Sequence, residues 1–167
     1  MIDFMLLASP RSGTTWSANW LSTDTTLCLH DPLWTRHYSE LDDIESAKKL
    51  GVSCTGLYLF PEFVNSHPAR KVILHRDLSE INESLDEIGL PMITQQQHKM
   101  LDQIEGLHFD YKDIFTKPRT IYEYLTGLPF DEERHELLLD IEMQPKFSGL
   151  KIGREVTRKL INELQGV

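Results

Sequence analysis

The chain has 167 residues, of which 40% are hydrophobic and 26% are charged. This length and balance are typical of one globular domain with its own core, so we predict a single domain over residues 1–167. The formal net charge of −9 at pH 7 disfavours non-specific binding to nucleic acid or to an anionic membrane, because a large basic field drives both.

Apolar runs, cysteines and histidines narrow the class further. No run of about 18 apolar residues occurs, and the start of the sequence lacks the basic flank of a signal peptide, so we expect a cytoplasmic protein. Cys28 and Cys54 are too few for a disulfide framework, and we predict that both are buried thiols. The seven histidines are scattered without metal-ligand spacing, and we expect no structural metal.

The first predicted unit is a strand, a tight loop and a helix. An apolar run at residues 4–7 precedes the stretch 8–16, which leads into helically spaced apolar positions at 17–21. A loop in this order directs backbone N–H groups and the positive end of a helix dipole at one point, which suits a phosphate or a sulfate. Gly13 permits close approach of the backbone. Further donors are the hydroxyls of Ser12, Thr14 and Thr15.

This loop departs from the pattern of nucleoside-triphosphate loops, which is Gly, four residues, Gly, Lys and then Ser or Thr. When Gly13 is aligned with the second glycine, Ala8 stands at the first glycine and Thr14 at the lysine. The fixed positive charge is instead Arg11, inside the loop, and Pro10 stiffens the chain just before it.

The stretch from Pro10 to Trp16 resembles the first signature of sulfotransferases that use 3'-phosphoadenosine 5'-phosphosulfate (PAPS), which reads Pro-Lys/Arg-Ser-Gly-Thr-Thr and often Trp. The resemblance is to compact members of bacterial or phage kind. It implies a three-layer α/β fold of P-loop type, with a parallel sheet of about five strands flanked by helices. It also implies PAPS or its product 3',5'-ADP as the ligand, with Trp16 stacked on adenine. The cofactor-binding residues that it implies in this loop are Pro10, Arg11, Ser12, Gly13, Thr14, Thr15 and Trp16.

Further elements follow in the next part of the chain. We predict a short strand that ends before Asp31 and Pro32, where proline stops regular pairing. A helix is predicted to begin with Ser39 as its N-cap and to end at Gly51. The predicted elements are a strand at 25–30, a helix at 39–50, a strand at 52–55 and a helix from about residue 61.

The second signature of the same family occurs at a strand-to-helix junction. Residues 70–75 predict a short strand whose apolar centre, Val72-Ile73-Leu74, is typical of a strand covered on both faces, and Arg76 follows it. Asp77 and Glu80 have the spacing of a capping box for a helix that reaches about residue 88. The family has a Ser eight residues after the Arg, here Ser84, and the resemblance implies that Arg76 and Ser84 hold the 3'-phosphate.

The last third of the chain supports the fold more than the chemistry. We predict a capped helix at 94–105, a final parallel strand at 107–111 and a helix that begins at Pro118. The stretch 127–133 is similar to a downstream segment of many bacterial sulfotransferases. Residues 151–154 loosely resemble the basic C-terminal segment that closes over the 3'-phosphate in larger relatives, and a solvated face of a terminal helix explains them equally well.

Two neighbouring residues are candidates for the base that removes the acceptor proton. His30 and Asp31 match the place where many family members have Glu-Pro, with Asp31 as the aligned acid. His30 has the better ordinary pKa for a base, and successive residues of a strand point to opposite faces, so we expect one of the two to face the site. Arg11 is placed to stabilise the charge that grows on the leaving 5'-phosphate oxygen.

Two other functions remain open at this point. A small P-loop kinase would bind ATP with magnesium, and the absent loop lysine counts against it. A catalytically inactive nucleotide-binding module of sulfotransferase fold is the other alternative, since the chain leaves few residues for an acceptor pocket. The predicted partner is a small-molecule or glycan-type acceptor, and the sequence does not specify the oligomeric state.

Overall fold

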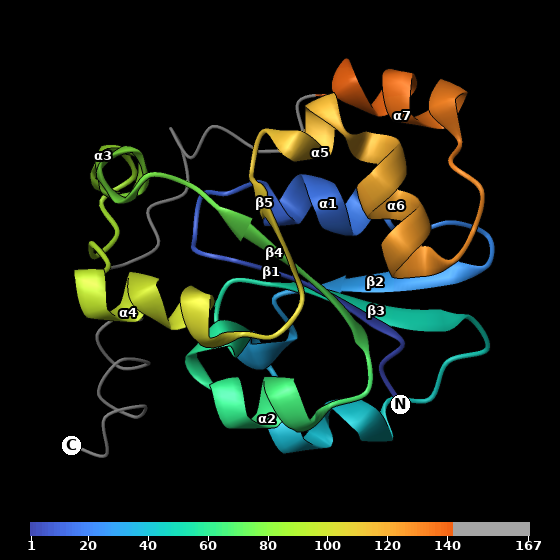
Figure 1. Cartoon of the computed structure of the whole chain (residues 1–167), viewed down its shortest axis with the longest axis horizontal. Coiled ribbons are helices and arrows are strands. Elements are labelled where there is room, and N and C mark those ends of the chain that lie inside the picture. The colour runs from blue at the N-terminus through green and yellow to red at the C-terminus, as the bar shows by residue number, and fades with distance from the viewer. Residues whose placement is uncertain (142–167) are drawn as a thin grey trace.

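A computed structural model describes residues 1–141 of the chain. Its centre is a five-stranded sheet in the order β2-β3-β1-β4-β5, in which every pair of neighbouring strands is parallel. Helices lie on both faces of this sheet (Figure 1), which confirms the predicted α/β class. The strands are β1 Phe4–Ala8, β2 Thr26–His30, β3 Lys49–Cys54, β4 Arg70–His75 and β5 Leu107–Asp110.

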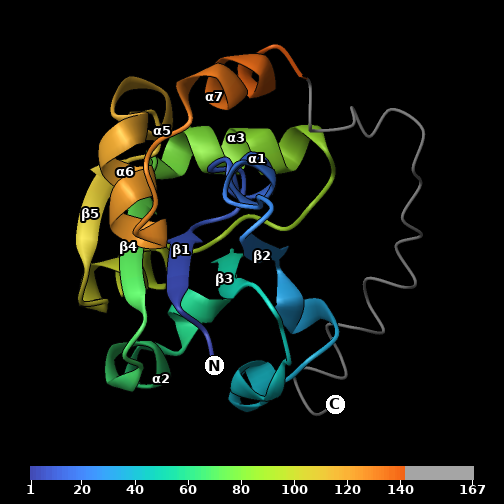
Figure 2. The same cartoon turned by 90° about the vertical axis from the view of Figure 1, so that its right-hand side faces the viewer.

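The helices are short, and several are single 3-10 turns. Figures 1 and 2 show α1, α6 and α7 on one side of the sheet and α2 on the other, and Figure 1 shows α4 on the same side as α2. The α-helices are α1 Thr14–Trp20, α2 Pro61–Ser66, α3 Leu78–Glu87, α4 Gln95–Lys99, α5 Asp113–Thr116, α6 Pro118–Thr126 and α7 Glu132–Leu139. The 3-10 turns are η1 Pro32–Trp34, η2 Tyr38–Asp43, η3 Leu57–Leu59 and η4 Met100–Gln103. Within residues 1–141, no helix has the length and apolar character needed to cross a membrane.

Strand β1 separates two hydrophobic cores because successive side chains of a strand point to opposite faces. Met5 and Leu7 enter the core under α2 and η4, whereas Phe4, Leu6 and Ala8 enter the core under α1 and α6. All five side chains have 0% exposure. A strand covered on both faces reads as a continuous apolar run, which explains why this one is recognisable in the sequence.

The chain order puts β1 at the point where the sheet reverses its direction of growth. From β1 the chain passes to β2 at one edge and returns to β3, and it then crosses to β4 and β5 on the other side. Ligands of open parallel sheets bind in the crevice outside the carboxyl ends of the strands at such a point. The loop after β1 therefore occupies the position that this architecture favours for a site.

The helix predicted at residues 39–50 is wrong. A 3-10 turn capped by His37 spans Tyr38–Asp43, and β3 already begins at Lys49. Gly51, expected to end the helix, lies inside that strand, and a Cβ there would come within 2.0 Å of a ring carbon of Phe4. The glycine therefore makes room for an aromatic ring of the neighbouring strand instead of ending a helix.

Several other predictions are confirmed with small shifts of boundary. Strand β4 has the predicted bounds, and α2 and α6 begin at the predicted prolines. Thr94 and Gln97 form the predicted capping box, but α4 ends at Lys99 and continues as a 3-10 turn. Both cysteines are buried free thiols. The basic segment at 151–154 lies outside the described residues.

Candidate functional site

The loop between β1 and α1 adopts a conformation that only a few residue types tolerate. Arg11 and Gly13 have positive φ angles of 64° and 81°. A Cβ at Gly13 would also lie 3.0 Å from Cδ1 of Ile114, so glycine meets both the backbone and the space requirement. These turns fold the loop back over the end of β1 and lead directly into the first turn of α1.

Arg11 joins the two sequence signatures in space. Its Nε donates a hydrogen bond of 2.9 Å to Oγ of Ser84, which lies 73 residues further along the chain on α3. The guanidinium of Arg76 in turn donates to the carbonyl oxygen of Arg11. Three residues predicted for phosphate binding therefore lie in direct contact at the carboxyl edge of β1 and β4.

Arg76 is held on two further sides. Its Nε donates to a carboxylate oxygen of Glu80 at 3.0 Å, one helical turn away, and its guanidinium lies 4.7 Å from the ring centroid of Tyr111. Glu80 therefore pairs with Arg76 and does not make the predicted reciprocal contact of a capping box, although Asp77 does cap α3. These contacts fix the plane of the guanidinium, and the carboxylate of Glu80 offsets part of its positive charge.

Glu80 and Tyr111 are two site residues that were not predicted from the sequence. The spacing of four residues between Arg76 and Glu80 was one available signal, because such pairs face each other on a helix. The place of Tyr111 directly after β5 was the other, since strand ends meet at one edge of a parallel sheet.

His30 and Asp31 contact each other and the start of α1. Nε2 of His30 lies 3.2 Å from Oδ2 of Asp31, and the hydroxyls of Thr14 and Thr15 lie 3.4 and 3.2 Å from the same nitrogen. The histidine side chain is 38% exposed, whereas that of Asp31 is 12% exposed. Both candidate bases are thus adjacent to the phosphate-type loop, and they differ in their access to solvent.

Thr55, another residue that the sequence analysis missed, holds Asp31. Its backbone N–H and its hydroxyl both donate to Oδ1 of Asp31, at 2.5 and 3.0 Å. Nothing in the spacing of these residues points to this contact, because it joins the ends of two neighbouring strands, β2 and β3.

Trp16 lies in the hydrophobic core between α1, α5 and α7 and is 8% exposed. Its ring centroid is 5.3 Å from those of Trp20 and Phe115 and 5.5 Å from that of His135, and its Nε1 donates to the carbonyl of Leu138. These neighbours occupy most of the indole surface. Its stacking on an adenine ring stays a prediction.

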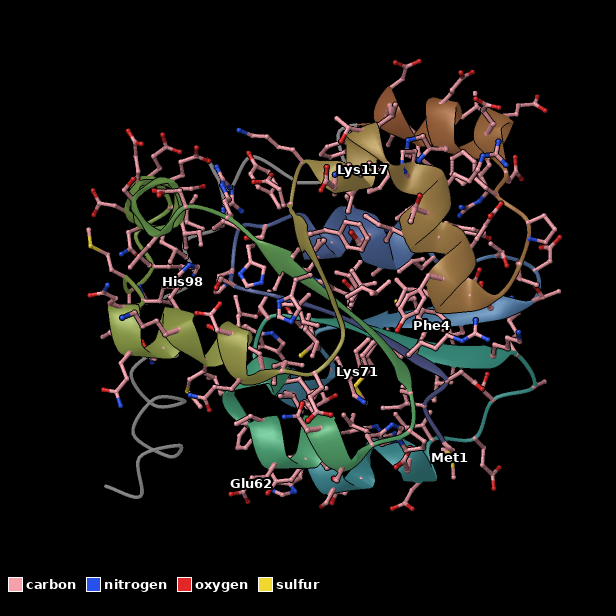
Figure 3. All side chains as sticks on the ribbon, viewed as in Figure 1. Met1, Phe4, Glu62, Lys71, His98 and Lys117 are labelled. Atoms are coloured by element: carbon pink, nitrogen blue, oxygen red, sulfur yellow. The ribbon has the colours of Figure 1, made fainter. Side chains whose placement is uncertain are left out.

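Buried polar groups support the loop from beneath. Oγ of Ser53 donates a hydrogen bond of 2.9 Å to the carbonyl of Thr14, and Oγ of Ser12 lies 3.5 Å from the carbonyl of Pro10. Ser9, at the end of β1, contacts Nδ1 of His98 at 3.1 Å; this histidine lies on α4 (Figure 3). Contacts of this kind fix the loop before any ligand is present, which favours binding.

The site contains both cationic and anionic side chains. Arg11 and Arg76 lie at the loop with His30 beside it, and the carboxylates of Glu80 and Asp31 pair with Arg76 and His30. In the part of the chain that the structure describes, no group of three or more His, Cys, Asp or Glu residues is arranged to hold a metal ion. Arginines and loop N–H groups at one strand edge provide the chemistry of an anion-binding site.

Known proteins give no direct guide to this site. No protein-family model matches the chain, and a search of curated proteins finds no significant match. The function is therefore inferred from the residues themselves and from their geometry.

Proposed function

We propose that this protein is a sulfotransferase that moves a sulfuryl group from PAPS to an acceptor hydroxyl or amine. The observation that carries the proposal is the 2.9 Å hydrogen bond between Arg11 and Ser84. It brings together two stretches that independently resemble the 5'-phosphosulfate and the 3'-phosphate signatures of one family. A ligand with phosphates at both positions would engage both stretches at once.

Sulfuryl transfer breaks the bond between sulfur and the 5'-phosphate oxygen while a bond forms between sulfur and the acceptor atom. Such loose in-line transfers depend mainly on positioning and on electrostatic stabilisation. Arg11 and the loop N–H groups would stabilise the charge on the leaving oxygen. Arg76 and Ser84 would hold the 3'-phosphate, and the contact of Arg11 with Ser84 adds positive charge to that position.

The acceptor loses a proton in this reaction, and His30 and Asp31 are the candidates to take it. Their contact with Thr14 and Thr15, through Nε2 of His30, places the pair beside the loop that would hold the donor. We propose a small-molecule or glycan-type acceptor, and a cytoplasmic location in which both buried cysteines remain reduced.

Calorimetry with 3',5'-ADP and with ATP, each in EDTA and in magnesium, tests the cofactor class. We expect 3',5'-ADP to bind in EDTA, because arginines and backbone donors supply the charge that a nucleotide kinase takes partly from magnesium. Tighter binding of ATP that depends on magnesium would favour a kinase instead. Binding of 3',5'-ADP without any consumption of PAPS would identify an inactive nucleotide-binding module.

A further inference from the structure

Asp31 has both carboxylate oxygens engaged by neighbouring groups. Oδ1 accepts from the backbone N–H and the hydroxyl of Thr55, while Oδ2 lies 3.2 Å from Nε2 of His30. Burial, together with the charge of Asp31, raises the pKa of the neighbouring Cys54 thiol to about 12. A carboxylate whose two oxygens are engaged in this way, and whose side chain is 12% exposed, offers little access to a substrate hydroxyl.

The contact with Asp31 favours a proton on one particular nitrogen of His30. An ionised carboxylate only accepts hydrogen bonds, so the 3.2 Å approach of Oδ2 to Nε2 favours a proton on Nε2. The hydroxyls of Thr14 and Thr15 face the same nitrogen and fit either ring form, as acceptors from an Nε2–H or as donors to an unprotonated Nε2. With the proton on Nε2, Nδ1 is unprotonated, and among the described residues it has no hydrogen-bond partner.

The backbone holds Asp31 in place before any ligand binds. Its φ and ψ angles of 42° and 55° lie in the left-handed region, which an aspartate seldom adopts. Its N–H donates to the carbonyl of Ser53 at 3.0 Å, and Pro32 follows directly. A residue in such a conformation persists only where its surroundings hold it, and sites of this kind cluster at functional centres.

We propose that Thr55 is a positioning residue, which holds Asp31 so that His30 keeps its proton on Nε2 and presents Nδ1 as the base. During transfer, the acceptor proton passes to Nδ1 as the bond from the acceptor to sulfur forms and the bond from sulfur to the 5'-phosphate oxygen breaks. Asp31 remains ionised and stabilises the imidazolium that results. The catalytic part of this inference rests on the proposed function, whereas the orientation of the ring does not.

Nitrogen NMR of the labelled full-length protein reads the protonated ring nitrogen directly and needs no ligand. We expect Nε2 of His30 to carry the proton in the wild type. In Asp31→Asn, the Thr55 donors hold the amide oxygen and the NH2 group faces the ring, so we expect the proton to move to Nδ1. Asp24→Asn, a change at an exposed residue just before the start of β2, is the control and leaves the proton on Nε2. A wild-type ring that is protonated on Nδ1, or an Asp31→Asn ring unchanged from wild type, overturns the proposal.

Substitutions of Thr55 test the positioning role separately. Thr55→Val removes one donor to Asp31 and keeps the backbone N–H, so we expect a mixture of both ring forms, with Thr55→Ser restoring the wild-type form. With PAPS and phenol or glucosamine as probe acceptors, we expect turnover to fall about three- to tenfold in Thr55→Val and roughly 100-fold or more in Asp31→Asn. Thr25→Val, at an exposed threonine, is the control. Equal ring forms and turnover in Thr55→Val and wild type overturn the role of Thr55.

The failure of this inference and the failure of the proposed function give different results. The expected ring forms without any binding of 3',5'-ADP in EDTA would overturn the sulfotransferase function and with it the catalytic use of His30. Binding of 3',5'-ADP together with the wrong ring form would overturn the assignment of His30 Nδ1 as the base and leave the cofactor class intact.

Discussion

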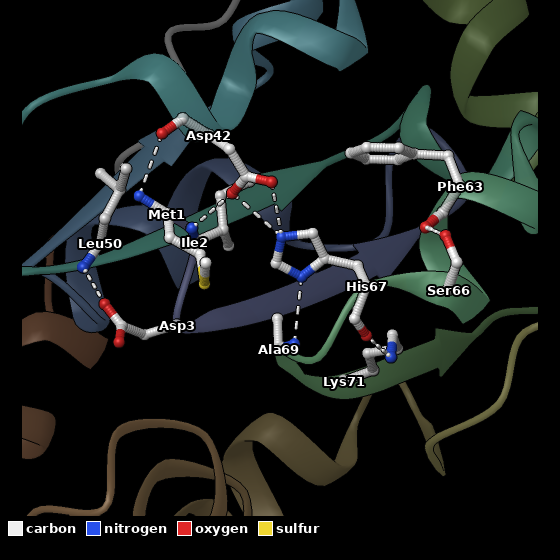
Figure 4. Close-up of polar contacts among 10 residues, drawn as sticks. All are labelled: Met1, Ile2, Asp3, Asp42, Leu50, Phe63, Ser66, His67, Ala69 and Lys71. Carbon is white, nitrogen blue, oxygen red and sulfur yellow. Dashed lines mark hydrogen bonds and ion pairs between the residues drawn. The ribbon is translucent and has the colours of Figure 1, made fainter.

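Two histidine–aspartate pairs lie at opposite ends of the parallel sheet, and they differ in what their geometry permits. The pair of His67 and Asp42 lies beside the start of β1 (Figure 4), whereas that of His30 and Asp31 lies beside the loop that follows β1. The distances between nitrogen and carboxylate are similar, at 3.0 and 3.2 Å. Pairing with a carboxylate alone therefore does not distinguish a structural histidine from a candidate base.

The imidazole of His67 is fully occupied. Its Nε2 lies 3.0 Å from both carboxylate oxygens of Asp42, and its Nδ1 accepts a 3.0 Å hydrogen bond from the N–H of Ala69. Asp42 also accepts from the N–H of Ile2, so this pair ties η2 and the turn before β4 to the start of β1 (Figure 4). With 4% of the side chain exposed, this imidazole has a structural role.

The imidazole of His30 has one nitrogen engaged and one free among the described residues, and 38% of the side chain is exposed. Access to the second ring nitrogen is thus the feature that separates the two pairs. A base needs an unprotonated nitrogen that a substrate can reach, and only the pair beside the loop provides it.

The largest expected effect that separates the pairs is on turnover. His30→Gln removes the nitrogen that we assign as the base, so we expect turnover of PAPS to fall roughly 100-fold or more, with the affinity for 3',5'-ADP nearly unchanged. His67→Gln serves as the matched change at the other pair and should keep the turnover of the folded fraction. Equal losses of affinity and turnover in His30→Gln would indicate a structural role for this residue as well.

For stability, we expect the larger loss from a substitution of His67 and the smaller loss from a substitution of His30. His67→Ala leaves the Asp42 carboxylate and the Ala69 N–H without their partner, and we expect the free energy of unfolding to fall by about 1.5–3 kcal/mol. His30→Ala lies at a partly exposed site and should change it by no more than about 0.5 kcal/mol. Urea denaturation of both variants measures the difference, and similar losses in the two would contradict the division into a structural and a chemical pair.

The sequence predicts the fold correctly where an element has a clear hydrophobic pattern on one or both faces. Strand β1 is a continuous apolar run, β4 has the apolar centre Val72-Ile73-Leu74, and Pro61 and Pro118 mark helix starts as expected. The error at residues 39–50 has a physical cause. Leu41 and Leu50 are both buried and fit a helical period, but they lie in different elements, and tertiary pairing with β2 takes residues 49–50 into the sheet.

The sequence predicts those parts of the candidate site that are short local motifs. The loop around Arg11 and the junction at Arg76 and Ser84 are local patterns, and the structure brings them into contact. Thr55 and Tyr111 belong to no such motif, since each acts through a contact with a residue of a neighbouring strand or of the loop that follows it, and the place of Tyr111 after a strand was its one available signal. Such partners depend on strand order, which a short motif does not encode.

The next effect in size concerns the anion site. The resemblance assigns Arg76 and Ser84 to the 3'-phosphate, and a charge-assisted contact contributes more than a hydroxyl contact. We expect Arg76→Ala to weaken 3',5'-ADP binding about 10- to 100-fold and Ser84→Ala about two- to tenfold. Binding of 5'-AMP, which lacks the 3'-phosphate, should barely change. Equal losses for both ligands in Arg76→Ala would show that this arginine supports the fold, and the phosphate assignment would be withdrawn.

A smaller effect is expected from acid. Burial raises the pKa of Asp42, but the hydrogen bonds from His67 and Ile2 outweigh burial, and the net pKa lies below the ordinary value of 3.8. A carboxyl with a lowered folded-state pKa contributes stability that is complete above its unfolded pKa and is lost as the pH falls through the folded value. We therefore expect Asp42→Asn to flatten the loss of stability below about pH 4. An acid profile identical to that of the wild type would contradict this role.

The smallest effect concerns Glu80. Its negative charge lies beside the proposed phosphate site and works against the binding of an anion there. Asp42 stabilises the fold through its negative charge, whereas Glu80 pairs with Arg76 at 3.0 Å and so competes with any anion for that guanidinium. The carboxylate is 43% exposed, and exposed pairs one helical turn apart contribute about 0.3–0.5 kcal/mol. We therefore expect Glu80→Gln to tighten 3',5'-ADP binding about twofold at low salt, with the gain shrinking as salt screens the charges.

The pair of Arg119 and Glu123 provides a matched control for this change. It has the same spacing and a distance of 3.4 Å, but it lies on α6 away from the loop, so Glu123→Gln should leave the affinity unchanged. Weaker binding in Glu80→Gln would carry a different meaning. Glu80 would then orient Arg76 for the phosphate and would not compete with it. In that case Glu80 and Asp42 would have the same role, because each would hold its partner in place, Arg76 for Glu80 and His67 for Asp42.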